Sequence, residues 1–165
     1  MSRDKPGMVT YLQDHQDEFE TAMRIALSQK QPISWRATWM IGGCVNKFSS
    51  KIQPYIQNIL DVLPELEDGH QREFLKVLNQ LELDDEHEGQ LLDFSIHLWE
   101  QLKKQPSVRH TAFRIMVKAA KKYPELNNEI LMLTQPQYLN TLSPGVKAGV
   151  FKMIDELRKK IGENY

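Results

Sequence analysis

Two short motifs place a carboxylate three residues before a histidine, a spacing that puts two metal ligands on one face of a helix. They are Glu67-x-x-His70 and Asp84-x-x-His87. A carboxylate-bridged metal site in a helical bundle needs such pairs on inward-facing helix surfaces. Both motifs fall in predicted turns among polar residues. The sequence therefore predicts no metal site.

Other catalytic arrangements are equally weak. The chain has no Gly-rich phosphate loop, no nucleophile elbow and no His-Glu-x-x-His motif. Asp93 and His97 lie one helical turn apart, which favours an ordinary surface pair. Cys44 falls on an apolar stripe without a neighbouring base, which favours an inert buried thiol over a nucleophile. We expect a non-enzymatic protein without a cofactor.

Charge is unevenly distributed along the 165 residues, although the net charge is only -1. Residues 61–100 hold twelve acidic and two basic residues, whereas residues 103–160 hold twelve basic and four acidic residues. These regions are solvated helix faces, or they attract each other within one chain or between copies, or they form two binding faces of opposite sign. The candidate binding stripe consists of Arg109, Arg114, Lys118, Lys121, Lys122 and Lys152.

Apolar residues at intervals of three and four predict helices throughout, and no segment has the alternating pattern of a strand. About eight helices are expected, so the fold class is all-α. Gly42 and Gly43 interrupt the second helix, Trp35 and Trp39 are expected to be buried, and Phe151 is placed on the buried face of the last helix. The expected helices cover residues 9–29, 34–48, 51–63, 70–81, 84–104, 106–123, 125–134 and 143–157, with a loop at 135–141.

A basic residue recurs near the start of every second helix, at intervals of about 37 residues. Each follows a turn and precedes apolar residues, as in Val108-Arg109-x-x-Ala112 and Val146-Lys147. The shared position favours a role in the framework of the repeats, with the alkyl stems packed and the charged heads tying neighbouring repeats. The four residues are Arg36, Arg72, Arg109 and Lys147.

This pattern resembles the HEAT repeat of armadillo-type α-solenoids over residues 32–160. The resemblance implies a right-handed α-solenoid of about four helical hairpins, folded as one domain over residues 1–165. It also implies a scaffold whose even-numbered helices line a concave face and hold a protein or peptide, with the basic stripe meeting an acidic partner. In the family the repeated base often pairs with an acid of the preceding turn, and here only Asp68 stands near that position.

An alternative function is nucleic-acid binding, because some HEAT-like proteins that resemble this chain bind DNA. Alkylpurine DNA glycosylases are among them. The basic segment supports this alternative, while the acidic segment would repel a phosphate backbone. A glycosylase would also need a carboxylate and an aromatic residue beside the basic surface, and the C-terminal third shows no such pair. We therefore expect a protein partner before a nucleic acid.

Composition sets the remaining expectations. With 41% hydrophobic and 26% charged residues, the chain is typical of folded globular proteins. The single cysteine excludes an internal disulfide, and the first residues lack the apolar region of a signal peptide, which favours the cytoplasm. The longest apolar run, residues 39–45, is too short to span a membrane. The oligomeric state is left open.

Overall fold

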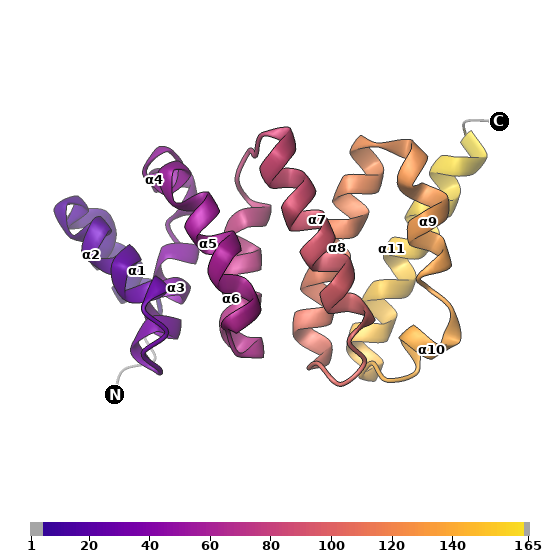
Figure 1. Cartoon of the computed structure of the whole chain (residues 1–165), viewed down its shortest axis with the longest axis horizontal. Coiled ribbons are helices and arrows are strands. Elements are labelled where there is room, and N and C mark those ends of the chain that lie inside the picture. Colours follow the sequence, from indigo (N-terminus) through magenta and orange to yellow (C-terminus); the bar gives the residue numbers. More distant parts are fainter. Residues whose placement is uncertain (1–4, 164–165) are drawn as a thin grey trace. The chain divides into compact units, whose positions relative to one another are not determined.

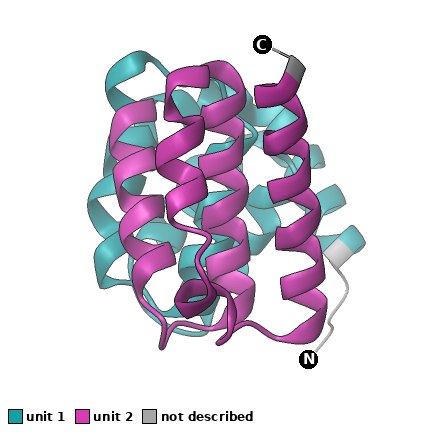
Figure 2. Ribbon diagram, turned by 90° about the vertical axis from the view of Figure 1, so that its right-hand side faces the viewer, with its two compact units in different colours: residues 1–87 teal, residues 88–165 magenta. Residues whose placement is uncertain are grey.

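The computed structural model describes residues 5–163, and all regular elements in this range are helices (Figure 1). The chain divides into two compact units, unit 1 up to His87 and unit 2 from Glu88 onwards (Figure 2). The prediction of an all-α fold is therefore confirmed for the described residues.

Unit 1 contains a series of short helices, most of them linked by single 3-10 turns. Short helices are marginal alone and depend on packing of their apolar faces. The elements are α1 (Lys5–Asp14), η1 (Gln16–Glu18), α2 (Phe19–Leu27), α3 (Ile33–Gly42), α4 (Val45–Ile52), η2 (Gln53–Tyr55), α5 (Ile56–Val62), η3 (Leu63–Glu65) and α6 (Asp68–Asn79).

In unit 1, α3 packs against both α2 and α6. Phe19 and Phe48 form an aromatic pair in the core, with ring centroids 5.1 Å apart. Trp35 and Trp39 are stacked on each other along α3, 5.9 Å apart, and each is half-buried rather than fully enclosed. Both tryptophans therefore keep part of their ring surface accessible.

Two of the expected helices are each broken in the structure. The helix expected over 34–48 ends at Gly42, and α4 begins only at Val45, after Cys44 with a non-helical φ of -118°. Consecutive glycines lower helix stability by about 1 kcal/mol each relative to alanine. A Cβ on Gly42 would lie 3.7 Å from Val77 Cγ2, an ordinary contact, so close packing does not require glycine there. The helix expected over 9–29 breaks at His15, where φ is -120° and ψ is 63°.

Unit 2 contains longer helices. α7 (Asp85–Glu100) begins three residues before the boundary between the units, and Asp84 caps its N-terminus by accepting a hydrogen bond from the His87 backbone N–H at 2.9 Å. The segment 135–141, expected to be a loop, includes the one-turn helix α10. The other elements are α8 (Pro106–Lys122), η4 (Pro124–Leu126), α9 (Asn127–Met132), α10 (Pro136–Leu139) and α11 (Pro144–Glu163).

The core of unit 2 lies where α7, α8 and α11 meet. Trp99 and Phe113 are fully buried with ring centroids 4.6 Å apart, and Val150 and Ile154 of α11 join the same cluster. Phe151 is 45% exposed, so its expected inward position is wrong. Successive helical residues are rotated by about 100°, and the side of α11 that carries Val150 faces the core, which turns Phe151 outward.

Candidate functional site

Helices α8 and α11 lie side by side in unit 2 and run in the same direction (Figure 1). His110 in the first half of α8 contacts Gly149 near the start of α11, and Lys121 near the end of α8 contacts Glu156 farther along α11. A Cβ on Gly149 would lie 3.1 Å from His110 Nε2. The glycine therefore allows the imidazole to approach the neighbouring helix closely.

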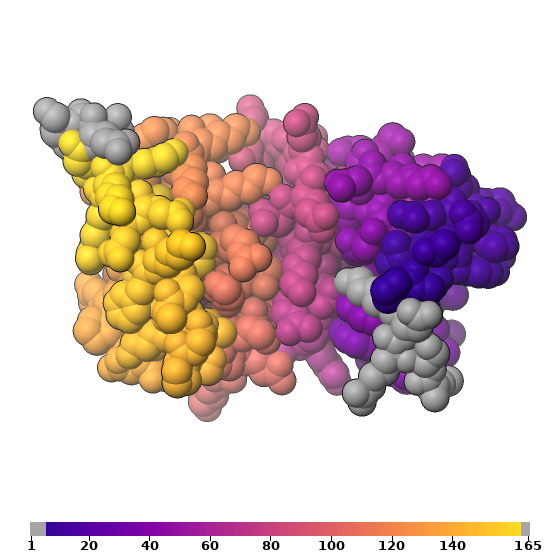
Figure 3. All heavy atoms as spheres, turned by 180° about the vertical axis from the view of Figure 1, so that it is seen from behind, coloured from indigo at the N-terminus to yellow at the C-terminus, as the bar shows by residue number. Residues whose placement is uncertain are grey.

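Exposed basic side chains line this pair of helices. Residues three, four or seven apart share a helix face, so Arg114, Lys118 and Lys121 occupy one face of α8, and Lys152 and Lys159 occupy one face of α11. All five residues are exposed. Figure 3 shows α11 in yellow beside the salmon and orange residues of α8. We call these five residues the α8–α11 basic face.

Glu156 is an acidic residue within this basic face. Its carboxylate accepts a hydrogen bond from Lys121 Nζ at 2.8 Å. That bond, followed by the positive charges of Lys121, Lys152 and Lys159, lowers the pKa of Glu156. Glu156 is therefore ionised at neutral pH. Asp155 is exposed at helical spacing between Lys152 and Lys159, so the face carries two acidic residues against five basic ones. The remaining charge gives this surface a positive potential, which attracts anionic groups.

Arg109, expected both in the binding stripe and in the repeat framework, is completely buried. Its Nε donates to the Trp99 carbonyl at 2.9 Å, Nη1 donates to Thr141 Oγ1 at 2.8 Å, and Nη2 donates to the Tyr138 carbonyl at 2.8 Å. The guanidinium also lies 4.5 Å from the centroid of the Trp99 ring, a cation–π distance. Arg109 therefore belongs to the interior of unit 2 and is no part of an exposed stripe.

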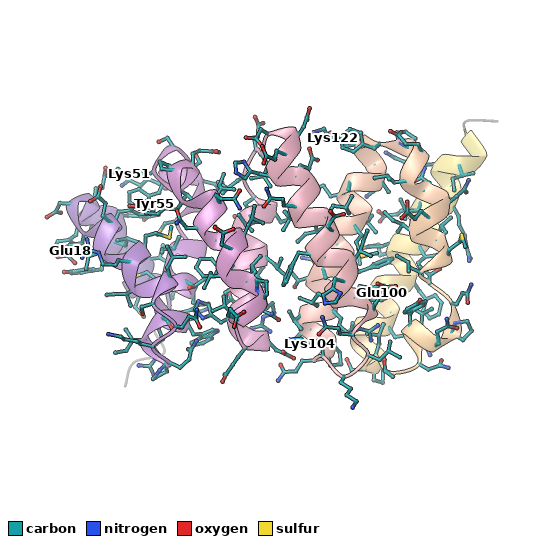
Figure 4. The ribbon with its side chains drawn as sticks, viewed as in Figure 1. Glu18, Lys51, Tyr55, Glu100, Lys104 and Lys122 are labelled. Atoms are coloured by element: carbon teal, nitrogen blue, oxygen red, sulfur yellow. The ribbon has the colours of Figure 1, made fainter. Side chains whose placement is uncertain are left out.

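Lys122 points away from the basic face. Its Nζ lies 2.6 Å from Glu88 Oε2 on α7, and the Tyr123 hydroxyl donates to the same oxygen at 3.2 Å (Figure 4). The hydrogen bond to Glu88 is the largest of the effects that raise the pKa of Lys122. Lys122 thus connects the end of α8 with the first half of α7, although its side chain stays 53% exposed.

The other repeated bases differ from Arg109 in their surroundings. Arg36 is half-buried beside a pocket in unit 1, and Lys147 is half-buried on α11. Arg72 donates from Nη2 to Glu73 Oε1 at 3.2 Å, and this glutamate side chain is only 4% exposed. A common framework role for these three residues stays a prediction.

The histidines of the two carboxylate–histidine motifs, His70 and His87, contact other protein side chains. Asp84 Oδ1 lies 2.9 Å from His87 Nδ1 in addition to capping α7. His70 is 1% exposed, with Nδ1 at 2.8 Å from Gln31 Nε2 and Nε2 at 2.8 Å from Thr38 Oγ1. Burial lowers the pKa of His70. Within residues 5–163, no three His, Cys, Asp or Glu side chains are grouped so that they could hold a metal ion.

The other candidate reactive residues are Cys44, Asp93 and His97. Cys44 is buried, and its Sγ lies 3.6 Å from the Val9 carbonyl. Asp93 and His97 are both exposed on α7. Burial in apolar surroundings disfavours the thiolate, which is the nucleophilic form of cysteine. The burial of Cys44 agrees with the expected buried thiol, and Asp93 and His97 lie at the surface as expected, while their pairing stays a prediction.

Sequence reasoning missed two residues at this surface. Lys159 follows Lys152 by seven residues, so helical spacing alone could have added it to the basic face. His110 precedes Arg114 by four residues on the same helix, and burial together with the charge of Arg114 lowers the pKa of His110. Its contact with Gly149 depends on the packing of two distant segments, so no local pattern identifies it.

The series of packed helices in each unit is consistent with a helical repeat protein. More specifically, the chain belongs to the HEAT repeat family, because the family model described as a HEAT repeat domain matches residues 2–157. Proteins of this family are helical scaffolds that commonly mediate protein interactions and are typically not enzymes. Comparisons with curated proteins and with solved structures give no significant match.

Within residues 5–163, none of the helices is both long and apolar enough to cross a bilayer.

Proposed function

We propose that this chain is a non-catalytic scaffold whose α8–α11 basic face binds an acidic segment of a protein partner. The supporting observation is that two adjacent helices present five exposed bases against two acidic residues, Asp155 and Glu156. At physiological ionic strength electrostatic attraction acts over about 8 Å, so bases on neighbouring helices act together on one bound segment. HEAT repeat proteins commonly mediate protein interactions, which favours a protein over other anions.

Two contacts between the helices support the same proposal. The contact between His110 and Gly149 joins their first halves, and the Lys121–Glu156 ion pair joins them farther along. A surface that is ordered before binding loses less conformational entropy on association. Arg114, Lys118 and Lys152 thus occupy defined positions on either side of the helix–helix contact.

A charge-reversal experiment tests the proposal with a fluorescein-labelled poly-glutamate peptide as the probe. We expect Arg114→Glu, Lys118→Glu and Lys152→Glu together to weaken binding by about tenfold or more, measured by fluorescence anisotropy. The matched control reverses Arg24, Lys30 and Lys103, which are exposed elsewhere and produce the same change in net charge. Equal binding by the two triple variants would remove the basic face from the proposal.

A labelled DNA duplex of random sequence separates the two classes of anionic partner. If the wild-type chain binds this duplex more tightly than poly-glutamate at the same salt concentration, nucleic-acid binding replaces the proposed function. In that case affinity should fall linearly with the logarithm of salt concentration. We expect the preference for poly-glutamate instead.

A further inference from the structure

The segment that joins α6 to α7 presents a row of acidic side chains. We call residues 82–86 the acidic connector. Its acidic residues are all exposed, and they are Glu82, Asp84, Asp85 and Glu86. No lysine or arginine occurs between residues 77 and 102, so no base within this stretch of sequence offsets the four negative charges.

Neighbouring groups of unit 1 position the connector without neutralising it. Gln53 Nε2 donates to the Glu82 carbonyl at 3.1 Å, which holds the start of the connector beside η2. Lys51 lies two residues before Gln53, but its Nζ donates to the Gln16 carbonyl at 3.2 Å. The nearest lysine in that element is therefore directed to a backbone oxygen.

Most carboxylates of the connector lack an ion pair within the chain. Asp84 pairs with His87, whereas the other three carboxylates form no ion pair with a residue of the described range 5–163. These three groups are Glu82, Asp85 and Glu86. Their charge can therefore act on another molecule.

The α8–α11 basic face has the opposite charge, with five bases against Asp155 and Glu156. Glu156 pairs with Lys121, whereas Arg114 and Lys159 form no ion pair with a carboxylate in the part of the chain that the structure describes. The seven residues from Lys152 to Lys159 rise about 10.5 Å along α11, and residues 82–86 span at most about 14 Å. The two charged rows thus have similar lengths.

We propose that the basic face of one copy of this chain binds the acidic connector of a second copy. This inference rests on the proposed function and names the partner of the same face. Opposite charge favours this pairing over contact between two connectors or between two basic faces. The net charge of only -1 leaves little overall repulsion between copies.

The proposed contact is heterologous, because two different surfaces of the same chain meet. Each copy in a pair retains one unoccupied connector or one unoccupied basic face, so association continues into open chains of copies or closes into a ring. Exposed ion pairs are individually weak and are screened by salt. We therefore expect the association to be weak and to depend strongly on ionic strength.

Sedimentation velocity of the full chain tests the contact. At about 20 mM sodium chloride we expect the wild-type chain to associate as its concentration rises toward about 1 mM, and to return to monomer at about 500 mM sodium chloride. A wild-type chain that binds labelled poly-glutamate but stays monomeric at low salt would overturn this inference alone. A chain that neither associates nor binds poly-glutamate would overturn the proposed function as well.

Neutralisation of the connector tests the assignment of the acidic surface. We expect Glu82→Gln, Asp85→Asn and Glu86→Gln together to weaken association about tenfold or more, while binding of poly-glutamate stays unchanged. The matched control replaces three exposed glutamates in the first turns of other helices by glutamine, with the same change in net charge, and should associate like the wild-type chain. The control residues are Glu20, Glu125 and Glu129.

Reversal of the basic face tests the other surface. The Arg114→Glu, Lys118→Glu and Lys152→Glu variant should lose both self-association and poly-glutamate binding, whereas its charge-matched control from the binding experiment should keep both. Circular dichroism should show equal helicity for all variants. Self-association that persists in the connector variant, or that its control loses equally, would overturn the proposed contact.

Discussion

Replacement of the buried Arg109 by methionine tests whether its hydrogen bonds outweigh the cost of burying its charge. The side chain is completely buried, and burial lowers the pKa of its guanidinium. Three acceptors, none of them ionised, receive its hydrogen bonds: the Trp99 and Tyr138 carbonyls and Thr141 Oγ1. Methionine keeps the length of the side chain but removes both the charge and the donors.

The expected loss of stability follows from two opposing terms. Hydrogen bonds from a charged donor contribute about 1.5–3 kcal/mol each, so three contribute roughly 4–9 kcal/mol. The desolvation of one buried ion costs several kcal/mol, which methionine avoids. The Trp99 and Tyr138 carbonyls lose their donor in the variant, and the desolvation of the buried Trp99 carbonyl is then uncompensated. We expect Arg109→Met to lower the free energy of unfolding by about 3 kcal/mol.

Urea unfolding followed by circular dichroism measures this change. With a denaturant dependence of about 2 kcal/mol/M, the midpoint should fall by about 1.5 M at an unchanged slope. Arg114→Met, an exposed position on the same helix, is the control and should change stability by less than about 0.5 kcal/mol. An Arg109→Met variant as stable as the wild-type chain would show that the desolvation cost cancels the hydrogen bonds and would refute the reasoning.

Three further predictions follow from the same structure. The pKa of His70 is lowered in the folded state, so the unfolded chain binds a proton at a higher pH than the folded chain, and the free energy of unfolding should fall by up to about 1.4 kcal/mol per pH unit below about pH 6.5. His70→Gln should reduce this pH dependence in urea unfolding between pH 7 and about 5.5, and an unchanged dependence would contradict the prediction. The Cβ added by Gly89→Ala on α7 meets no other atom within 4 Å, so this variant should raise the free energy of unfolding in urea by about 1 kcal/mol. Gly149→Ala should raise it by less, because the added Cβ would lie 3.1 Å from His110 Nε2, and equal increases would argue against this close contact. We also propose that residues 1–165 fold as one domain, so calorimetry should show a single transition with equal calorimetric and van't Hoff enthalpies; two separate transitions would assign independent folding to the two units.

Helical periodicity predicted the fold class well because each helix is amphipathic and its apolar residues fall at regular intervals. It was less successful at helix ends. The break at His15 has no glycine or proline to signal it, and it arises where α2 turns to pack on α3. Phe151 was misplaced because an apolar residue beside Val150 extends the apolar stripe in sequence, while the core of unit 2 covers only one side of the helix.

The basic face was partly predictable. Spacing along α8 correctly grouped Arg114 with Lys118, because both positions share one helix surface. The repeat pattern located Arg109 but did not show whether it faces solvent or the interior, because its acceptors lie on segments about ten and thirty residues away. The Lys122 side chain points toward α7 because it pairs with Glu88, a residue of that helix. Contacts between distant segments therefore decided which bases remain exposed.

The placement of the three tryptophans gives each unit its own optical reporter. Trp35 and Trp39 are half-buried in unit 1, whereas Trp99 is enclosed in unit 2, with Nε1 donating to the Leu133 carbonyl at 2.9 Å. Replacement of Trp99 by phenylalanine would leave tryptophan emission from unit 1 alone, and replacement of the other two would leave tryptophan emission from unit 2 alone. The order in which the two halves of the chain lose structure can thus be followed without an added dye.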